Sequence, residues 1–390
     1  MKICIVGLGA RIAHVTALLC KANPDARLAG FVDPAPAGRA SLEAATGQAM
    51  HAHATLEEML KADQPDLLMV GSPNFMHLDH IRTALDHGTP HIFAEKPVVV
   101  SEDETFALLD ALEKAGGHQR VMVGLVLRYA PLYRALRASL DSGQIGDVVS
   151  IEAAEHIGPY HGSFFMRDWR RHSRYSGGFM LEKCCHDLDL YQGVVGARAM
   201  RVASFGGRRS FVPENRPPEG TRFPRPETPG RVDPFEPRWN GGASDFDSDG
   251  DLVDHQTALI EYEGGANLCF HTNMYVPDEF RRFAVIGTKG MAEGDFIRNF
   301  YRAHDAVTGK RLVDMPDLGG THDGHYGADE AMAQDLIAHM NGDLGLPVSV
   351  LDALEAGLTA LKIDEARQRG AVIDLAPTWD RFDSYDVKRN

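Results

Sequence analysis

The first 125 residues alternate short β-branched runs with helical patterns, and this rhythm constrains the possible folds more than any other feature. The pattern predicts strands at 2–6, 26–32, 67–71, 91–94 and 120–124, with helices between them such as 55–62 and 101–115. Strands that are separated by helices form parallel sheets with helices on both faces. We therefore expect an α/β domain over residues 1–125, built on a doubly wound parallel sheet.

From residue 148 the pattern changes to longer strands, expected at 148–156, 252–262, 266–275 and 280–287 and separated by glycine-rich turns. This pattern predicts a second, mostly antiparallel domain over residues 126–390, followed by helices at 328–341 and 350–370. Residues 208–251 are dense in Pro, Gly, Arg and Asp and are too long for a simple connection. We expect this segment to be a surface excursion.

Composition restricts the partners and the compartment. A formal net charge of -15 repels phosphate backbones and anionic lipids, so nucleic acid and membrane surfaces are excluded as expected partners. The apolar runs are too short to cross a bilayer and no signal-peptide pattern is seen, so we expect a cytoplasmic protein. Five cysteines without C-x-x-C spacing argue against a disulfide framework and a cysteine zinc site, and no metal site is expected.

A glycine-rich turn follows the first strand. Gly7 and Gly9 stand where backbone amides and a helix N-terminus can meet a pyrophosphate, whereas Ile12 replaces the third glycine of the dinucleotide fingerprint. Asp33 ends the second strand, where a carboxylate accepts hydrogen bonds from an adenosine ribose. The turn therefore predicts binding of NAD rather than NADP. The alternative is a structural turn with Asp33 capping a loop.

The loop after the next buried strand carries Ser72, Pro73, Asn74 and His77. Ligands of open α/β sheets bind at the carboxyl ends of the strands, so Pro73 and Asn74 are expected on the nicotinamide side. Asn74 could instead serve only as a turn former.

Several motifs together resemble the Gfo/Idh/MocA (glucose-fructose oxidoreductase and inositol dehydrogenase) family over nearly the whole chain. They are Gly7-Leu-Gly9, Pro73-Asn74-x-x-His77, Ala94-Glu95-Lys96-Pro97, Arg128-Tyr129, Gly177-Gly178 and Glu182-x-x-x-His186-Asp-Leu-Asp189. The resemblance implies a Rossmann domain, a C-terminal α/β domain with an open-faced mixed sheet that often forms dimers or tetramers, and hydride transfer between NAD(P) and a sugar or polyol. Family members commonly carry Asp at the position of Glu182 and Gly at that of Cys184, which affects how the substrate is placed.

Lys96, Glu182 and His186 are the expected catalytic residues. The resemblance places the lysine and the histidine at the reacting carbon, and both side chains can carry the hydroxyl proton of an alcohol. Glu182, His186 and Asp189 have i, i+4 and i+7 spacing, which predicts one shared helical face. Three other readings remain open: a solvated Lys96 paired with Glu95, a core histidine at 186, and a metal held by this face with His161.

The segment from His156 to Arg171 mixes aromatic rings with hydrogen-bond donors, as sugar sites do. An ordinary charged loop anchored by Trp169 is the alternative. His325 lies four residues before Asp329 and either reaches the same cleft or caps a helix. The candidate substrate residues are Lys96, His156, Tyr160, His161, Arg167, Trp169, Glu182, His186 and His325.

The candidate cofactor residues are Gly7, Gly9, Ala10, Arg11, Ile12, Asp33, Ser72, Pro73, Asn74, His77, Glu95, Lys96 and Arg128. The sequence thus predicts an NAD-dependent dehydrogenase or reductase of a sugar, sugar derivative or cyclic polyol that forms a homodimer or homotetramer. Two alternatives are an epimerase or glycoside-cleaving enzyme that recycles a tightly held NAD, and a non-catalytic sugar sensor.

Overall fold

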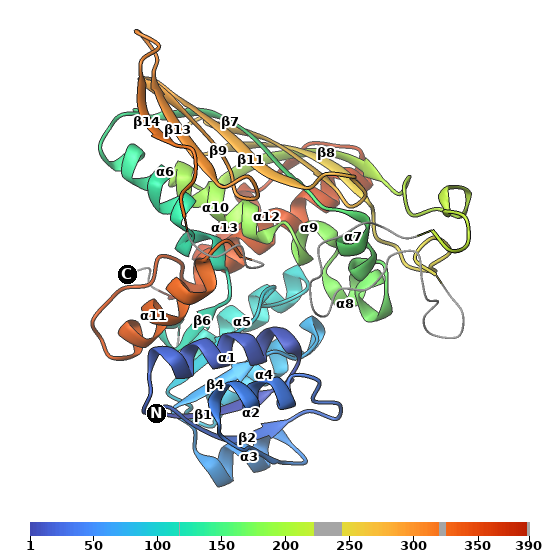
Figure 1. Ribbon diagram of the computed structural model, residues 1–390, viewed down its shortest axis with the longest axis vertical. Coiled ribbons are helices and arrows are strands. Elements are labelled where there is room, and N and C mark those ends of the chain that lie inside the picture. The colour runs from blue at the N-terminus through green and yellow to red at the C-terminus, as the bar shows by residue number, and fades with distance from the viewer. Residues whose placement is uncertain (117, 222–243, 320–324, 388–390) are drawn as a thin grey trace. The chain divides into compact units, whose positions relative to one another are not determined.

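The computed structural model describes residues 1–116, 118–221, 244–319 and 325–387 (Figure 1). The chain forms two compact units, of which the first comprises residues 1–130, 321–358 and 377–390 and the second residues 131–320 and 359–376. One of the boundaries between them falls within the long helix α12 (Val350–Arg369). A functional division at residue 125 stays a prediction.

A six-stranded parallel sheet forms the core of the first unit, in the order β3-β2-β1-β4-β5-β6. The strands are β1 (Lys2–Val6), β2 (Arg27–Val32), β3 (His51–Ala52), β4 (Leu67–Val70), β5 (His91–Ala94) and β6 (Val121–Val123). The strand order reverses direction at β1, and right-handed crossovers therefore place helices on both faces. This architecture confirms the expected doubly wound sheet.

The first unit contains several helices, two of which begin at side-chain N-caps. The helices are α1 (Ala10–Ala22), α2 (Arg39–Thr46), α3 (Leu56–Asp63), α4 (His77–Asp86), α5 (Glu102–Ala115), α11 (Ala328–Met340) and α13 (Ala376–Asp383), with the first part of α12. Thr55 and Ser101 each accept a hydrogen bond from the backbone N–H three residues ahead, as N-caps do. Helix α1 packs against α2 and α11, whereas α4 packs against α3 and α5.

A nine-stranded mixed sheet dominates the second unit, in the order β14-β13-β12-β11-β7-β10-β9-β8-β15. Its strands are β7 (Val148–His156), β8 (Ala199–Gly207), β9 (His255–Tyr262), β10 (Asn267–Asn273), β11 (Phe280–Gly287), β12 (Gly290–Asp295), β13 (Phe300–Asp305), β14 (Arg311–Met315) and β15 (Ile373–Asp374). Only the β7–β10 pair among these is parallel, because all other neighbours pair antiparallel. The expected mostly antiparallel sheet is confirmed.

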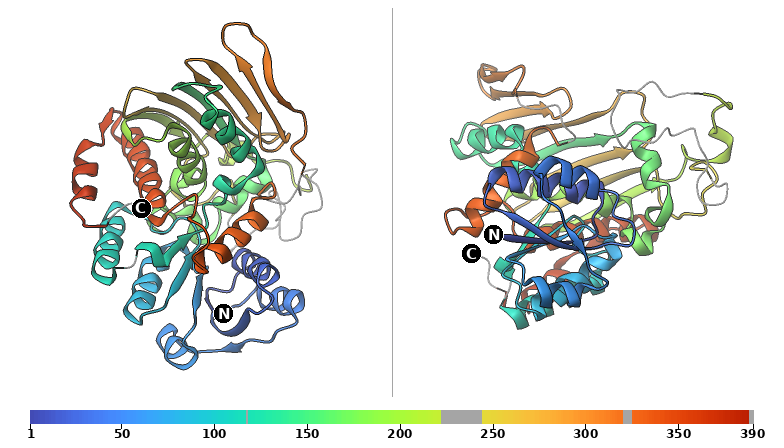
Figure 2. Two further views of the ribbon diagram at one scale, coloured as in Figure 1. Left: turned by 90° about the vertical axis from the view of Figure 1, so that its left-hand side faces the viewer. Right: turned by 60° about the horizontal axis from the view of Figure 1, so that its bottom comes forward.

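One face of this sheet is covered and the other is open. Helices α6 (Pro131–Asp141) and α10 (Cys185–Val195) lie along one face, and no helix of the described part of this unit covers the other (Figures 1 and 2). Burial alternates accordingly along β10, where Phe270 and Thr272 are buried while Cys269 and His271 face the open side. Phe205, Leu259 and Ile286 add apolar surface to that open face.

The excursion is packed at both of its described ends, although residues 222–243 lie outside the described part. Phe211 and Phe246 are buried with ring centroids 5.4 Å apart. The Asp254 carboxylate accepts hydrogen bonds from the backbone N–H groups of residues 209–211. The sequence did not predict these anchors, nor strands β3, β8 and β12–β15.

Candidate functional site

The glycine-rich turn leaves the N-terminus of α1 open to a ligand. Gly7 adopts a positive φ of 77°, and a Cβ there would lie 2.2 Å from the backbone nitrogen of Ser72, so no other residue fits. A Cβ at Gly9, the N-cap of α1, would meet nothing within 4 Å. The first turn of α1 carries no acidic side chain and no side-chain cap, which leaves its N–H groups available to an anion. These features fit the pyrophosphate of a dinucleotide.

Ile12 occupies the third glycine position of the fingerprint, and the absence of a side chain at Gly71 leaves room for it. A Cβ at Gly71, directly after β4, would lie 2.5 Å from the Cβ of Ile12. A glycine at the strand end therefore takes over the role of a glycine in the helix.

Asp33 is held by the turn that it faces. Its Oδ2 accepts a hydrogen bond from the N–H of Leu8 at 2.6 Å, and its Oδ1 accepts one from the N–H of Ala35 at 2.6 Å. The carboxylate is thus fixed after β2, where a ribose hydroxyl binds in dinucleotide folds.

Arg11 lies between two carboxylates within the first unit. Its guanidinium donates to Glu95 at 3.1 Å and in a two-pronged contact to Asp329 of α11 at 2.6 and 2.7 Å. His325 contacts Asp329 at 3.0 Å. Burial alone would raise the pKa of Asp329, but the hydrogen bonds from His325 and Arg11 lower it. The contact between Arg11 and Asp329 thus joins α1 to α11, and the contact between Arg11 and Glu95 joins α1 to the loop after β5.

His77 connects the two loops that carry Asn74 and Lys96. Its Nδ1 lies 2.8 Å from the carbonyl oxygen of Pro97, and its Nε2 lies 2.8 Å from that of Ser72. Burial lowers the pKa of His77 to about 4, so the ring is neutral at neutral pH and donates to one of these carbonyls. Lys96 is half-buried, Asn74 is buried, and Arg128 donates to the Pro347 carbonyl at 3.0 Å.

Glu182, His186 and Asp189 are all buried in the second unit, but they do not lie on one continuous helix. Glu182 ends α9 (Phe179–Glu182), while His186 and Asp189 belong to α10, which begins at Cys185. The prediction of a single helical face is therefore wrong. Lys183 and Cys184 form a turn between the two helices, and the Lys183 ammonium reaches Glu155 of β7 at 2.7 Å.

Three buried charged side chains and the partly buried Lys183 lie beside this break. Arg281 of β11 contacts Glu155 at 2.9 Å and donates to both carboxylate oxygens of Asp187 at 2.9 and 2.6 Å. Burial would raise the pKa of Glu155, but Arg281 and Lys183 lower it by Coulombic attraction. Two cations and two anions thus fix the residues on either side of His186.

Arg170 is a site residue that we did not predict from the sequence. Its guanidinium lies 4.0 Å from the ring centroid of Phe164 and 4.2 Å from that of Trp169, and its Nε lies 3.5 Å from Glu182. The Met166–Arg171 segment carries a signal for it, a mixture of rings and arginines, but we predicted Arg167 and Trp169 there instead. Arg167 donates to both oxygens of Asp245 at 2.7 and 2.9 Å, which anchors the excursion.

Tyr160 and His161 share one carboxylate, Glu279, which the sequence did not single out. The hydroxyl of Tyr160 and the N–H of Gly158 donate to Glu279, and His161 lies 3.8 Å from it. Burial alone would raise the pKa of Glu279, but these contacts lower it to about 2. His156 packs edge-on against Phe280 with centroids 4.5 Å apart, and burial lowers its pKa to about 4.

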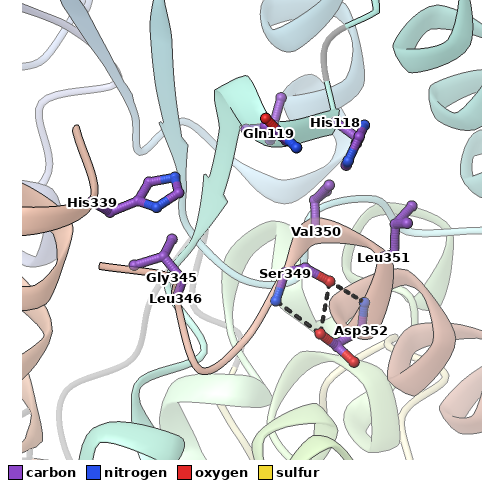
Figure 3. A pocket seen from close by; sticks show the side chains of 10 residues that line it. His118, Gln119, His339, Gly345, Leu346, Ser349, Val350, Leu351 and Asp352 are labelled. Atoms are coloured by element: carbon purple, nitrogen blue, oxygen red, sulfur yellow. Dashed lines mark hydrogen bonds between the residues drawn. The ribbon is translucent and has the colours of Figure 1, made fainter. Parts of the chain in front are cut away.

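A separate cavity of about 380 Å³ lies in the first unit where β6 begins. Figure 3 shows His118, Gln119 and His339 around it, with Ser349 and Asp352 hydrogen-bonded to each other at the start of α12. The turns that carry Gly7, Ser72 and Lys96 follow the carboxyl ends of strands, whereas this cavity lies at the amino end of β6. None of the candidate residues lines it.

The fold and these residues define a two-unit oxidoreductase with an NAD-binding Rossmann domain. Residues 1–125 match the oxidoreductase family with an NAD-binding Rossmann fold, and residues 133–293 match the Gfo/Idh/MocA C-terminal domain. The chain belongs to the Gfo/Idh/MocA family, which confirms the resemblance seen in the sequence.

The relatives include dehydrogenases of polyols and sugars. The oxidoreductase YteT of Bacillus subtilis is 24% identical over 80% of this chain and 81% of its own length. Inositol 2-dehydrogenase of Rhizobium meliloti is 27% identical over 51% of this chain, which spans only 56% of that relative. In the described part of the chain, no helix has the length and apolar character to cross a membrane.

Solved structures share the fold. Scyllo-inositol dehydrogenase from Lactobacillus casei, with bound NAD(H) and scyllo-inositol, has a TM-score of 0.72 at 19% identity, covering 96% of this chain and 99% of that one. Levoglucosan dehydrogenase in complex with NADH and levoglucosan has a TM-score of 0.73 at 16% identity, with the same coverage.

Proposed function

We propose that this protein is an NAD-dependent dehydrogenase that oxidises a CH–OH group of a cyclic polyol, sugar or sugar derivative. The observation that carries the proposal is an NAD-binding fold in a chain that also holds an ammonium, an imidazole and a carboxylate, Lys96, His186 and Glu182, at the matching family motifs. A catalytically silent sensor would not need these three groups.

The proton and the hydride leave the substrate by different routes. NAD, when bound, accepts the hydride from the reacting carbon. In our proposal Lys96 takes the hydroxyl proton and His186 shares or relays it, while Glu182 accepts a hydrogen bond from a neighbouring hydroxyl. Arg170 supports this role, because a guanidinium 3.5 Å away keeps the Glu182 carboxylate oriented.

A substrate screen tests the activity. Purified protein is incubated with NAD and separately with inositols, aldoses, sugar acids and anhydrosugars, and NADH is followed by its absorbance. We expect one of these classes to produce NADH well above the others. If every class fails while NAD binds, the dehydrogenase assignment is wrong and the sensor is favoured.

We expect NAD to bind more tightly than NADP, because a 2'-phosphate would meet the fixed carboxylate of Asp33. Repulsion between these charges is worth roughly 10- to 100-fold in affinity. Asp33→Ser should bring the two affinities close together, although it also removes the contact with Leu8 and so weakens both cofactors.

Fluorescence titration of both cofactors measures this ratio. Asp25→Ser, an exposed change before β2, is the matched control and should leave the ratio unaltered. Equal affinities in the unmodified protein would contradict the role of Asp33.

We also propose that the open face of the nine-stranded sheet is covered by a second copy of the chain. Phe205 is 74% exposed and Leu259 52% exposed on this face, and self-association would bury them. Light scattering at micromolar concentration should give a dimer or tetramer. Leu259→Glu should shift it toward monomer, whereas Val307→Glu, in the turn after β13, should not. A monomer in the unmodified protein would contradict the proposal.

A further inference from the structure

We propose that His51, His53 and Asp63 form a binding site for Zn²⁺ or a similar transition-metal ion in the first unit. This inference is independent of the dehydrogenase activity. It departs from our sequence-based expectation of no metal site, which considered cysteine spacing and His161 but not this H-x-H pair. One ligand atom from each of the three residues lies within 4.8 Å of the others.

The three side chains come from adjacent elements and converge on one point. His51 lies on the edge strand β3 and His53 follows two residues later, so both rings leave the strand on the same side. Asp63 is the last residue of α3. Its Oδ1 lies 3.2 Å from Nε2 of His51, and its Oδ2 lies 2.9 Å from Nε2 of His53.

Each of the two separations is close to that between neighbouring ligand atoms of a tetrahedral ion, and one ligand atom from each residue lies within 4.8 Å of the others. Imidazole nitrogens and carboxylate oxygens bind zinc at about 2.0–2.2 Å, which places neighbouring donors roughly 3.3 Å apart. Two nitrogens and one oxygen favour zinc, cobalt, nickel or copper over magnesium and calcium. Three protein ligands leave a position for water, and the His51 side chain is 57% exposed, so an ion can enter from solvent.

The neighbouring strand, β2, has a glycine beside this cluster. Gly30 of β2 pairs with His51, and a Cβ there would lie 2.3 Å from Oδ2 of Asp63 and 2.7 Å from the His53 ring. Only glycine leaves the space in which His53 and Asp63 meet. Without an ion the same contacts form a hydrogen-bonded cluster, so the two readings must be separated by measurement.

The test titrates Zn²⁺, and separately Co²⁺, into the chelator-treated full-length protein. We expect one equivalent to bind by calorimetry, and Co²⁺ to give the intense visible absorption of a tetrahedral site. His53→Gln should abolish both signals, and His51→Ala should weaken Zn²⁺ binding by roughly tenfold or more. Mg²⁺ should not compete.

Two further variants serve as controls for specificity and for folding. His87→Ala removes an exposed histidine elsewhere in the first unit and should change nothing. Asp63→Asn keeps hydrogen bonds to the two rings but removes the charge, and should lose Zn²⁺ while the thermal midpoint without metal changes little. The proposal is overturned if the unmodified protein binds no stoichiometric Zn²⁺, or if His53→Gln and Asp63→Asn both retain it.

Discussion

Replacing Lys96 or His186 with alanine should lower turnover by roughly a hundred- to ten-thousand-fold while NAD binding stays nearly intact. In our account the pyrophosphate and ribose are held by the turn at Gly7 and Gly9 and by Asp33, whereas Lys96 and His186 act on the substrate's hydroxyl proton. Loss of that proton must accompany departure of the hydride, so removing its acceptor affects the chemical step and not cofactor affinity.

Steady-state kinetics on the substrate found by the screen, together with NAD titration, provides the measurement. Because His186 is buried, His186→Ala removes the imidazole and also leaves a cavity. His186→Gln, which fills more of that space, separates loss of the imidazole from the effect of the cavity. Lys61→Ala, an exposed change on α3, is the control for Lys96. If the double variant is no slower than either single one, the two residues act as a unit. Wild-type turnover in both single variants would show that the proton path lies elsewhere.

Arg281→Met should lower the free energy of unfolding by about 3–5 kcal/mol, because it leaves the buried carboxylates of Glu155 and Asp187 with Lys183 as their remaining cation in this group. Arg281 is 1% exposed, so water cannot replace it. Denaturant unfolding measures the loss.

An exposed arginine on α12 offers the matched control. Arg369 pairs with Glu365 on the helix surface, so Arg369→Met should change stability by no more than about 1 kcal/mol. Equal losses in the two variants would show that the buried group contributes no more than a surface arginine.

Local signals in the sequence were sufficient for much of the fold. Strands β1, β5, β7 and β11 begin and end where their apolar patterns do, and the helix expected over 101–115 begins at an N-cap, Ser101. These features depend on residues close together in the chain, so their physical causes are visible in the sequence.

Long-range contacts were not predictable in the same way. Asp187 and Arg281 are 94 residues apart, and Tyr160 and Glu279 are 119 apart. The break between Glu182 and His186 has the same origin: the i, i+4 spacing assumed a continuous helix, whereas Lys183 pairs with Glu155 of β7, a long-range contact that no local rule predicts. The space that Gly71 leaves for Ile12 likewise depends on two elements that meet only in the folded chain.

In the proposed reaction, hydride moves from the substrate carbon to an NAD that then leaves the protein. The most direct test supplies carbon-deuterated substrate with unlabelled NAD in excess and measures the mass of the reduced cofactor in solution. We expect free NADH carrying one deuterium, in an amount equal to the ketone or lactone formed. Label that returns to an epimerised or cleaved product, with no reduced cofactor released, would contradict the proposed dehydrogenase and identify an enzyme that recycles its NAD.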